Sequence, residues 1–117
     1  MLVDLKTILA DTREKHYAVG LFNCVTLEMT KGILAAAEEL HSPVIIGPAE
    51  SFARASLAEY ADMMLGMARR AGVPVALHFD HASRRSWWKK PSAWAFPPLC
   101  TTAACCPLKK MCAAPVK

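Results

Sequence analysis

The sequence predicts an α/β protein with a parallel sheet covered by helices, and two observations support this class. Short, continuous apolar runs alternate with longer segments that have helical spacing and good helix formers. The runs lack the alternation of polar and apolar residues that a solvent-exposed sheet face requires, so both faces of each strand are expected to be buried. A closed barrel and an open, doubly wound sheet fit this pattern equally well.

The first elements alternate between the two types. Residues 3–15 are expected to form a short amphipathic helix with Leu5, Ile8 and Leu9 on one side, and residues 17–22 form the first apolar strand. A second helix is expected over residues 26–40. Thr26 can serve as its N-cap. Its expected buried stripe consists of Met29, Ile33, Leu34 and Ala37.

The same order then repeats. Residues 43–46 are expected to form the second strand, residues 56–71 a helix and residues 73–79 the third strand. Parallel strands separated by helices require such crossovers. No helical pattern follows the third strand.

Composition bounds the class of protein further. The 117 residues have the length of one small domain, and 54% are hydrophobic, which is typical of a chain that folds around a core. No apolar run approaches the roughly 18 residues of a membrane span, and the start carries Asp4 and Lys6 rather than an apolar signal core. A cytoplasmic protein without a membrane partner is therefore expected.

The chain changes character near Ser83. Residues 1–83 hold seven Lys/Arg, ten Asp/Glu, one Cys and no Trp, whereas residues 84–117 hold seven Lys/Arg, four Cys, three Trp and no acidic residue. A single natural domain seldom changes so abruptly. We therefore divide the chain into residues 1–83 and a basic tail, residues 84–117, that is expected to be irregular.

A cluster of polar residues, His78-Phe79-Asp80-His81, ends the third expected strand. The carboxyl ends of parallel strands commonly carry active-site groups. An imidazole can bind zinc and a neighbouring carboxylate can move a proton. The pattern alone also fits a hydrogen-bonded pair at a strand end, because zinc normally takes three or four protein ligands.

Three segments in order, LFNCVTLEM, SPVIIGPAE and VPVALHFDH, resemble the class II, zinc-dependent ketose-bisphosphate aldolases. The family includes fructose- and tagatose-bisphosphate enzymes, and the resemblance runs continuously to about residue 83. It implies an α/β fold that is a partial (β/α)₈ TIM barrel, with the first three strands present. It also implies a lyase of carbohydrate metabolism and glycolysis, a Zn²⁺ cofactor and a homo-oligomeric full-length enzyme.

The resemblance also implies roles for single residues. His81 matches the first of three zinc-binding histidines, Asp80 matches the catalytic acid/base toward the aldehyde, and Asn23 lies where the family lines the substrate pocket. Zinc would polarise the carbonyl of dihydroxyacetone phosphate and stabilise the enediolate. Fructose-specific members usually carry a phosphate-binding serine where this chain has Ala49, which leaves the particular ketose bisphosphate open.

The tail fits a slip of one nucleotide in the reading frame. Trp and Met have single codons, so the shifted frame forces Val from Trp87-Trp88 and Gly from Trp94-Ala95. Permitted codons elsewhere give LVEEAIRLGF, VMYDGS and LLPLEENVRRTRQ, which follow the family pattern. On this interpretation the chain is an aldolase fragment without useful activity.

The alternative is a small, basic, Cys-rich protein that binds metal or nucleic acid and is built on an aldolase remnant. The four tail cysteines lack the paired C-x₂-C spacing of structural zinc sites. The basic residues and Trp side chains form no recognisable nucleic-acid-binding motif. No specific nucleic-acid partner is therefore expected.

Overall fold

The structure, a computed structural model, describes residues 1–49 and 57–80 of the chain. Its sheet contains β1 (Gly20–Asn23), β2 (Val44–Gly47) and β3 (Val75–Leu77), all parallel and in that spatial order. Helix α2 (Leu27–Glu39) lies between β1 and β2 in the sequence, and α4 (Leu57–Arg70) lies between β2 and β3. The predicted α/β class, with parallel strands alternating with helices, is confirmed.

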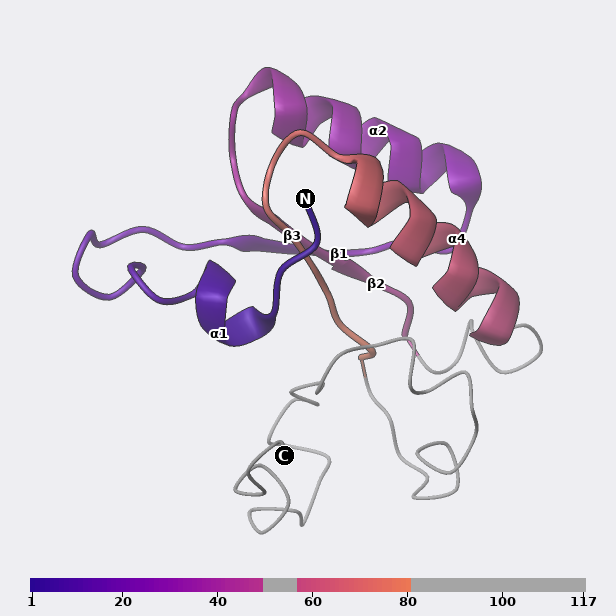
Figure 1. Cartoon of the computed structure of the whole chain (residues 1–117), viewed down its shortest axis with the longest axis horizontal. Helices are drawn as coiled ribbons and strands as arrows, with labels where there is room; N and C mark the ends of the chain where they lie inside the picture. The colour runs from indigo at the N-terminus through magenta and orange to yellow at the C-terminus, as the bar shows by residue number, and fades with distance from the viewer. Residues whose placement is uncertain (50–56, 81–117) are drawn as a thin grey trace, which may run out of the picture.

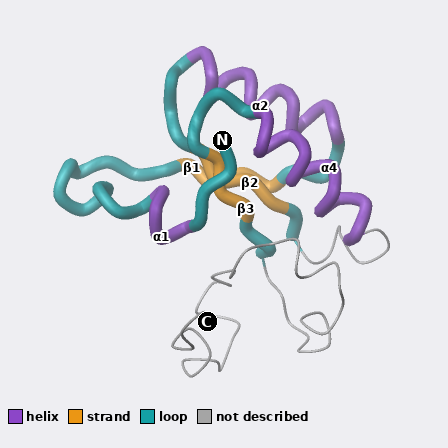
Figure 2. Tube along the Cα trace, viewed as in Figure 1, coloured by secondary structure: helices purple, strands orange, loops and turns teal. Residues whose placement is uncertain are grey.

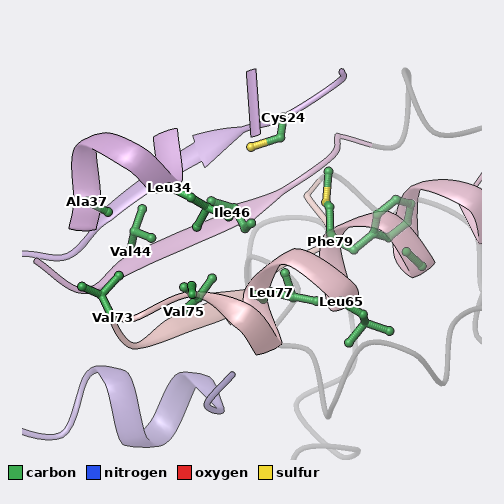
Figure 3. Packing of buried hydrophobic residues seen from close by; sticks show 14 residues of the cluster. Cys24, Leu34, Ala37, Val44, Ile46, Leu65, Val73, Val75, Leu77 and Phe79 are labelled. Atoms are coloured by element: carbon green, nitrogen blue, oxygen red, sulfur yellow. The ribbon is translucent and has the colours of Figure 1, made fainter. Parts of the chain in front are cut away.

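Helices α2 and α4 cover the same face of the sheet (Figures 1 and 2). Their inward side chains, Leu34 and Met64 among them, form one buried cluster with Ile46, Val75 and Leu77 of the strands. Figure 3 shows these strand side chains pointing toward the helices. Alternate residues of a strand point to opposite faces, so β2 and β3 each contribute every second side chain to this core.

The opposite face carries a smaller cluster, formed by Ile45 of β2, Ala76 of β3 and Ile8. Ile8 belongs to the short helix α1 (Leu5–Ile8), which lies on this side of the sheet (Figure 1). The chain start runs beside β3, where the Val3 amide donates to the Val75 carbonyl oxygen at 2.9 Å. We refer to this side of the sheet as the α1 face.

The helix predicted over residues 3–15 is much shorter in the structure. Asp4 caps α1 by accepting from the Thr7 amide at 2.6 Å, but the helix ends at Ile8 and turns follow as far as His16. After Leu9 the sequence offers few apolar side chains to pack, and a helix this short gains little from its own hydrogen bonds. Leu9 is accordingly exposed, contrary to the prediction.

Helix α2 confirms its predicted N-cap, because the Thr26 hydroxyl oxygen accepts from the Met29 amide at 3.2 Å. Its predicted stripe is wrong at one position. Met29 is exposed and Thr30 is fully buried, since the helix turns the 30, 34 and 37 positions toward the sheet. The Thr30 hydroxyl tolerates burial by donating to the Thr26 carbonyl oxygen at 2.9 Å.

The predicted burial of both strand faces holds for β2 and β3 but is wrong for β1. All four of its residues are exposed, whereas every residue of β2 and β3 is buried. Within residues 1–49 and 57–80, β1 pairs only with β2, so its outer edge is open. No helix in these two ranges is long and apolar enough to cross a membrane.

Candidate active site

The residues that the sequence placed at the predicted site lie together at the carboxyl ends of the three strands. Asn23 ends β1 and pairs with Gly47 at the end of β2, while Ala49, just beyond β2, forms a parallel bridge with Asp80, beyond β3. These residues are far apart in the sequence. The parallel register brings them to a single edge of the sheet.

The same register determines which face these residues occupy. Leu21 pairs with Ile45, which belongs to the α1 face, and Asn23 pairs with Gly47 two residues further on. Because every second residue of a strand points to the same face, Asn23 also lies on the α1 face. On β3, Ala76 belongs to that face as well. Asn23 and the residues in phase with Ala76 therefore lie on the side that α2 and α4 leave uncovered.

The chain stays extended beyond β3, so its side chains continue to alternate between the two faces of the sheet as far as Asp80. The His78 amide donates to the Ile46 carbonyl oxygen at 2.9 Å, and the Asp80 amide donates to the Pro48 carbonyl oxygen at 3.1 Å. Phe79, between them, is buried in the cluster under the helices. His78 and Asp80 consequently project to the α1 face, opposite Phe79.

Gly47 permits the close approach of these two strand ends. A Cβ atom built at this position would lie 1.5 Å from the His78 carbonyl oxygen, far inside van der Waals contact. Any side chain at residue 47 would therefore push away the segment that carries Asp80. This role of Gly47 was not predicted from the sequence, although a Gly-Pro pair at the end of an apolar run is a signal for irregular backbone.

His78 and Asp80 lie side by side on the α1 face. Their side chains are 4% and 14% exposed, and His78 Nε2 lies 3.6 Å from Asp80 Oδ1, which is beyond hydrogen-bond length. Among the described residues, neither ring nitrogen of His78 has a hydrogen-bond partner. A buried imidazole that lacks partners is unusual, because buried polar groups are normally satisfied.

Cys24 follows Asn23 but turns away from this site. It is fully buried and belongs to the helix-side cluster, whose side chains are drawn in Figure 3. Its amide donates to the Gly47 carbonyl oxygen at 3.0 Å. Burial raises the pKa of the Cys24 thiol. A thiol that resists ionisation is a poor nucleophile, so Cys24 is suited to packing in the core and not to nucleophilic attack.

Tyr60 of α4 holds the turn after β1. Its hydroxyl donates to the Val25 carbonyl oxygen at 2.6 Å, across 35 positions of sequence. The bond ties α4 to the segment that follows Asn23. Nothing in the sequence pattern marked Tyr60, because a long-range bond to a backbone carbonyl leaves no local signal.

The described residues do not by themselves fit a catalytic zinc. No group of three or more His, Cys, Asp or Glu residues among them lies close enough to hold a metal ion. Catalytic zinc normally takes three protein ligands. The predicted ligand, His81, lies outside the described residues, as does the whole tail with its predicted irregularity and frame shift.

The structure thus contains parallel βα units with a carboxylate, Asp80, and an amide, Asn23, at the shared carboxyl edge of the strands. A family model described as fructose-bisphosphate aldolase class-II matches residues 3–100. The chain therefore belongs to the class II fructose-bisphosphate aldolase family.

Individual relatives agree with this assignment. The fructose-bisphosphate aldolase of Thermus caldophilus is 42% identical over 83 residues, covering 71% of this chain and 27% of the relative. That of Geobacillus stearothermophilus is 44% identical over 86 residues, covering 70% and 30%. The crystal structure of the YdjI aldolase from Escherichia coli K12 matches with a TM-score of 0.73 and 39% identity, over 80% of this chain and 35% of that one. The chain thus spans about a third or less of each of these proteins.

Proposed function

We propose that this chain carries the first part of a zinc-dependent aldolase site for a ketose 1,6-bisphosphate. The parent reaction would cleave fructose or tagatose 1,6-bisphosphate to dihydroxyacetone phosphate and glyceraldehyde 3-phosphate. One observation supports the proposal most strongly: Asp80 and Asn23 share the carboxyl edge and the α1 face of the parallel sheet. A substrate at that edge could meet both side chains.

In this proposal Asp80 is the catalytic acid/base and Asn23 lines the substrate pocket. Asp80 suits proton transfer because its backbone is fixed by the bond to Pro48 and its side chain keeps 14% exposure. Ala49 is buried beside Asp80 and offers no hydroxyl, so a phosphate contact from this position is not expected. The identity of the bisphosphate depends on residues elsewhere.

His81 is the proposed first zinc ligand. One histidine does not hold catalytic zinc, and the donors available among the described residues do not complete a site. We therefore propose that the 117-residue chain alone has no useful aldolase activity. The parent enzyme is proposed to be a cytoplasmic homo-oligomer of carbohydrate metabolism, and the Cys-rich binding alternative has no support from the comparisons.

The test compares two proteins. The first is the 117-residue chain, and the second is a full-length version in which the reading frame after Ser83 is restored. Both are assayed with zinc for release of triose phosphates from fructose and tagatose 1,6-bisphosphates. Turnover by the restored protein alone supports the proposal. Comparable turnover by the 117-residue chain would contradict the proposal that this chain alone lacks a complete site.

A further inference from the structure

Resting on the proposed function, we propose that His78 is a positioning residue that fixes the orientation of the Asp80 carboxylate. The His78 side chain is only 4% exposed, yet both of its ring nitrogens lack a hydrogen-bond partner within the described part of the chain. Leaving a buried donor or acceptor unsatisfied costs about 1–3 kcal/mol. An apolar side chain would fill this position without that cost.

The geometry identifies the partner. His78 and Asp80 lie two residues apart on an extended segment, and both amides donate to β2 or its extension, so their side chains share the α1 face. The His78 nitrogen nearer to the carboxylate is Nε2, at 3.6 Å from Oδ1. A small side-chain rotation would shorten this separation to hydrogen-bond length. Contacts of catalytic groups are commonly long before substrate binds and tighten in the complex.

The surroundings favour a fixed imidazole. The His78 amide is bound to Ile46, and its carbonyl oxygen faces Gly47 so closely that the backbone has little room to shift. A hydrogen bond between buried groups is also stronger than one in water. His78 would thus hold one oxygen of the Asp80 carboxylate through Nε2–H and so fix the orientation of that carboxylate.

The first test observes the contact directly in the 117-residue chain. With ¹⁵N-histidine labelling, magic-angle-spinning NMR reports the protonation of each ring nitrogen without requiring a small monomer, and the His78→Gln variant identifies the His78 signals. We expect Nε2 of His78 to carry a proton and its resonance to shift in Asp80→Asn. Asp62→Asn, on the exposed side of α4, is the matched control and should change nothing. An unprotonated Nε2, or a resonance indifferent to Asp80→Asn, would overturn the proposal.

The second test separates positioning from simple packing in the frame-restored enzyme. His78→Gln keeps an N–H near the Nε2 position, whereas His78→Asn places its amide near Nδ1 and cannot reach Asp80. We expect His78→Asn to lower kcat roughly 10- to 100-fold with KM little changed, and His78→Gln to recover most of the loss. Equal losses in both variants would contradict positioning. An inactive restored enzyme would refute the proposed function, while the NMR result would still decide the His78–Asp80 contact.

Discussion

Gly47 shows how a single residue sets the geometry of the carboxyl edge of the sheet. The His78 carbonyl oxygen approaches the Gly47 backbone so closely that even one added carbon at residue 47 would collide with it. The same helix-and-strand scaffold contains Gly32 in α2, where an added Cβ meets no atom within 4 Å. The two glycines thus form a matched pair for mutation.

We expect Gly47→Ala to lower the free energy of unfolding by about 1–3 kcal/mol, because overpacking forces the backbone to shift. The bond from the Asp80 amide to Pro48 should weaken as β3 is displaced. Gly32→Ala should instead raise stability by roughly 0.5–1 kcal/mol, through helix propensity. Urea unfolding followed by circular dichroism measures both changes. A neutral Gly47→Ala would show that the strand ends are not closely packed.

Cys24 provides a pH-dependent prediction. Burial raises the pKa of its thiol, so the folded state disfavours the thiolate. The stabilising contribution is complete below the ordinary thiol pKa of about 8.5 and is lost as pH rises through the higher value of the folded chain. We expect iodoacetamide to alkylate Cys24 more slowly in the folded than in the urea-unfolded chain between pH 8 and 9.

Mass spectrometry of the peptide that contains Cys24 separates its alkylation from that of the tail cysteines. Cys24→Ala should also flatten the alkaline loss of stability, which isolates the thiol from other groups that titrate in that range. Rapid alkylation of Cys24 near neutral pH in the folded chain would contradict a buried, un-ionised thiol.

At the scale of elements, Tyr60 connects α4 to the turn after β1. Tyr60→Phe keeps the ring and removes the hydroxyl that donates to the Val25 carbonyl oxygen. We expect a loss of about 0.5–1.5 kcal/mol, the usual net value of one such hydrogen bond. Tyr17→Phe, at a ring that is 41% exposed, is the control and should be nearly silent. Urea unfolding midpoints compare the two variants, and equal midpoints would remove the structural role of the Tyr60 hydroxyl.

The sequence predicted the elements better than their contacts. Continuous apolar runs and helical spacing located all three strands, α2 and α4. Burial in the core imposes those patterns on β2, β3 and the two helices, whereas β1 is exposed although its sequence is apolar. The first helix was predicted too long, because the helical spacing of Leu5 and Ile8 was assumed to continue through the polar segment that follows. The positions of Asp80 and Asn23 at strand ends could be predicted because the end of an apolar run is visible in the sequence. Gly47, Tyr60 and the His78–Asp80 proximity depend on long-range packing, which no local pattern records.

At the scale of the whole molecule, β1 is an exposed edge of the sheet within the described residues, 1–49 and 57–80. Its Leu21 and Phe22 are 43% and 48% exposed, and no charged residue lies within the strand. An open, uncharged, apolar edge is a template for pairing with another chain. We expect the 117-residue chain to self-associate as its concentration rises.

Sedimentation velocity on single-residue variants tests this expectation. Phe22→Lys should reduce association, because a charge on an edge strand opposes edge-to-edge pairing. Leu40→Lys changes an equally apolar residue that is 75% exposed but lies at the end of α2, outside the sheet. We expect it to leave association unchanged. Equal effects of the two variants would indicate nonspecific association of exposed apolar residues rather than strand pairing through β1.

The central claim is that Asp80, placed at the carboxyl edge of the parallel sheet, is the acid/base of a class II aldolase site. The most direct measurement is kcat for aldol cleavage by the frame-restored enzyme and its Asp80→Ala variant, with zinc content measured in both. A positioned general acid/base contributes about 10²- to 10⁴-fold, so kcat should fall by that factor while zinc content stays the same. Undiminished kcat in Asp80→Ala with zinc bound would contradict the account.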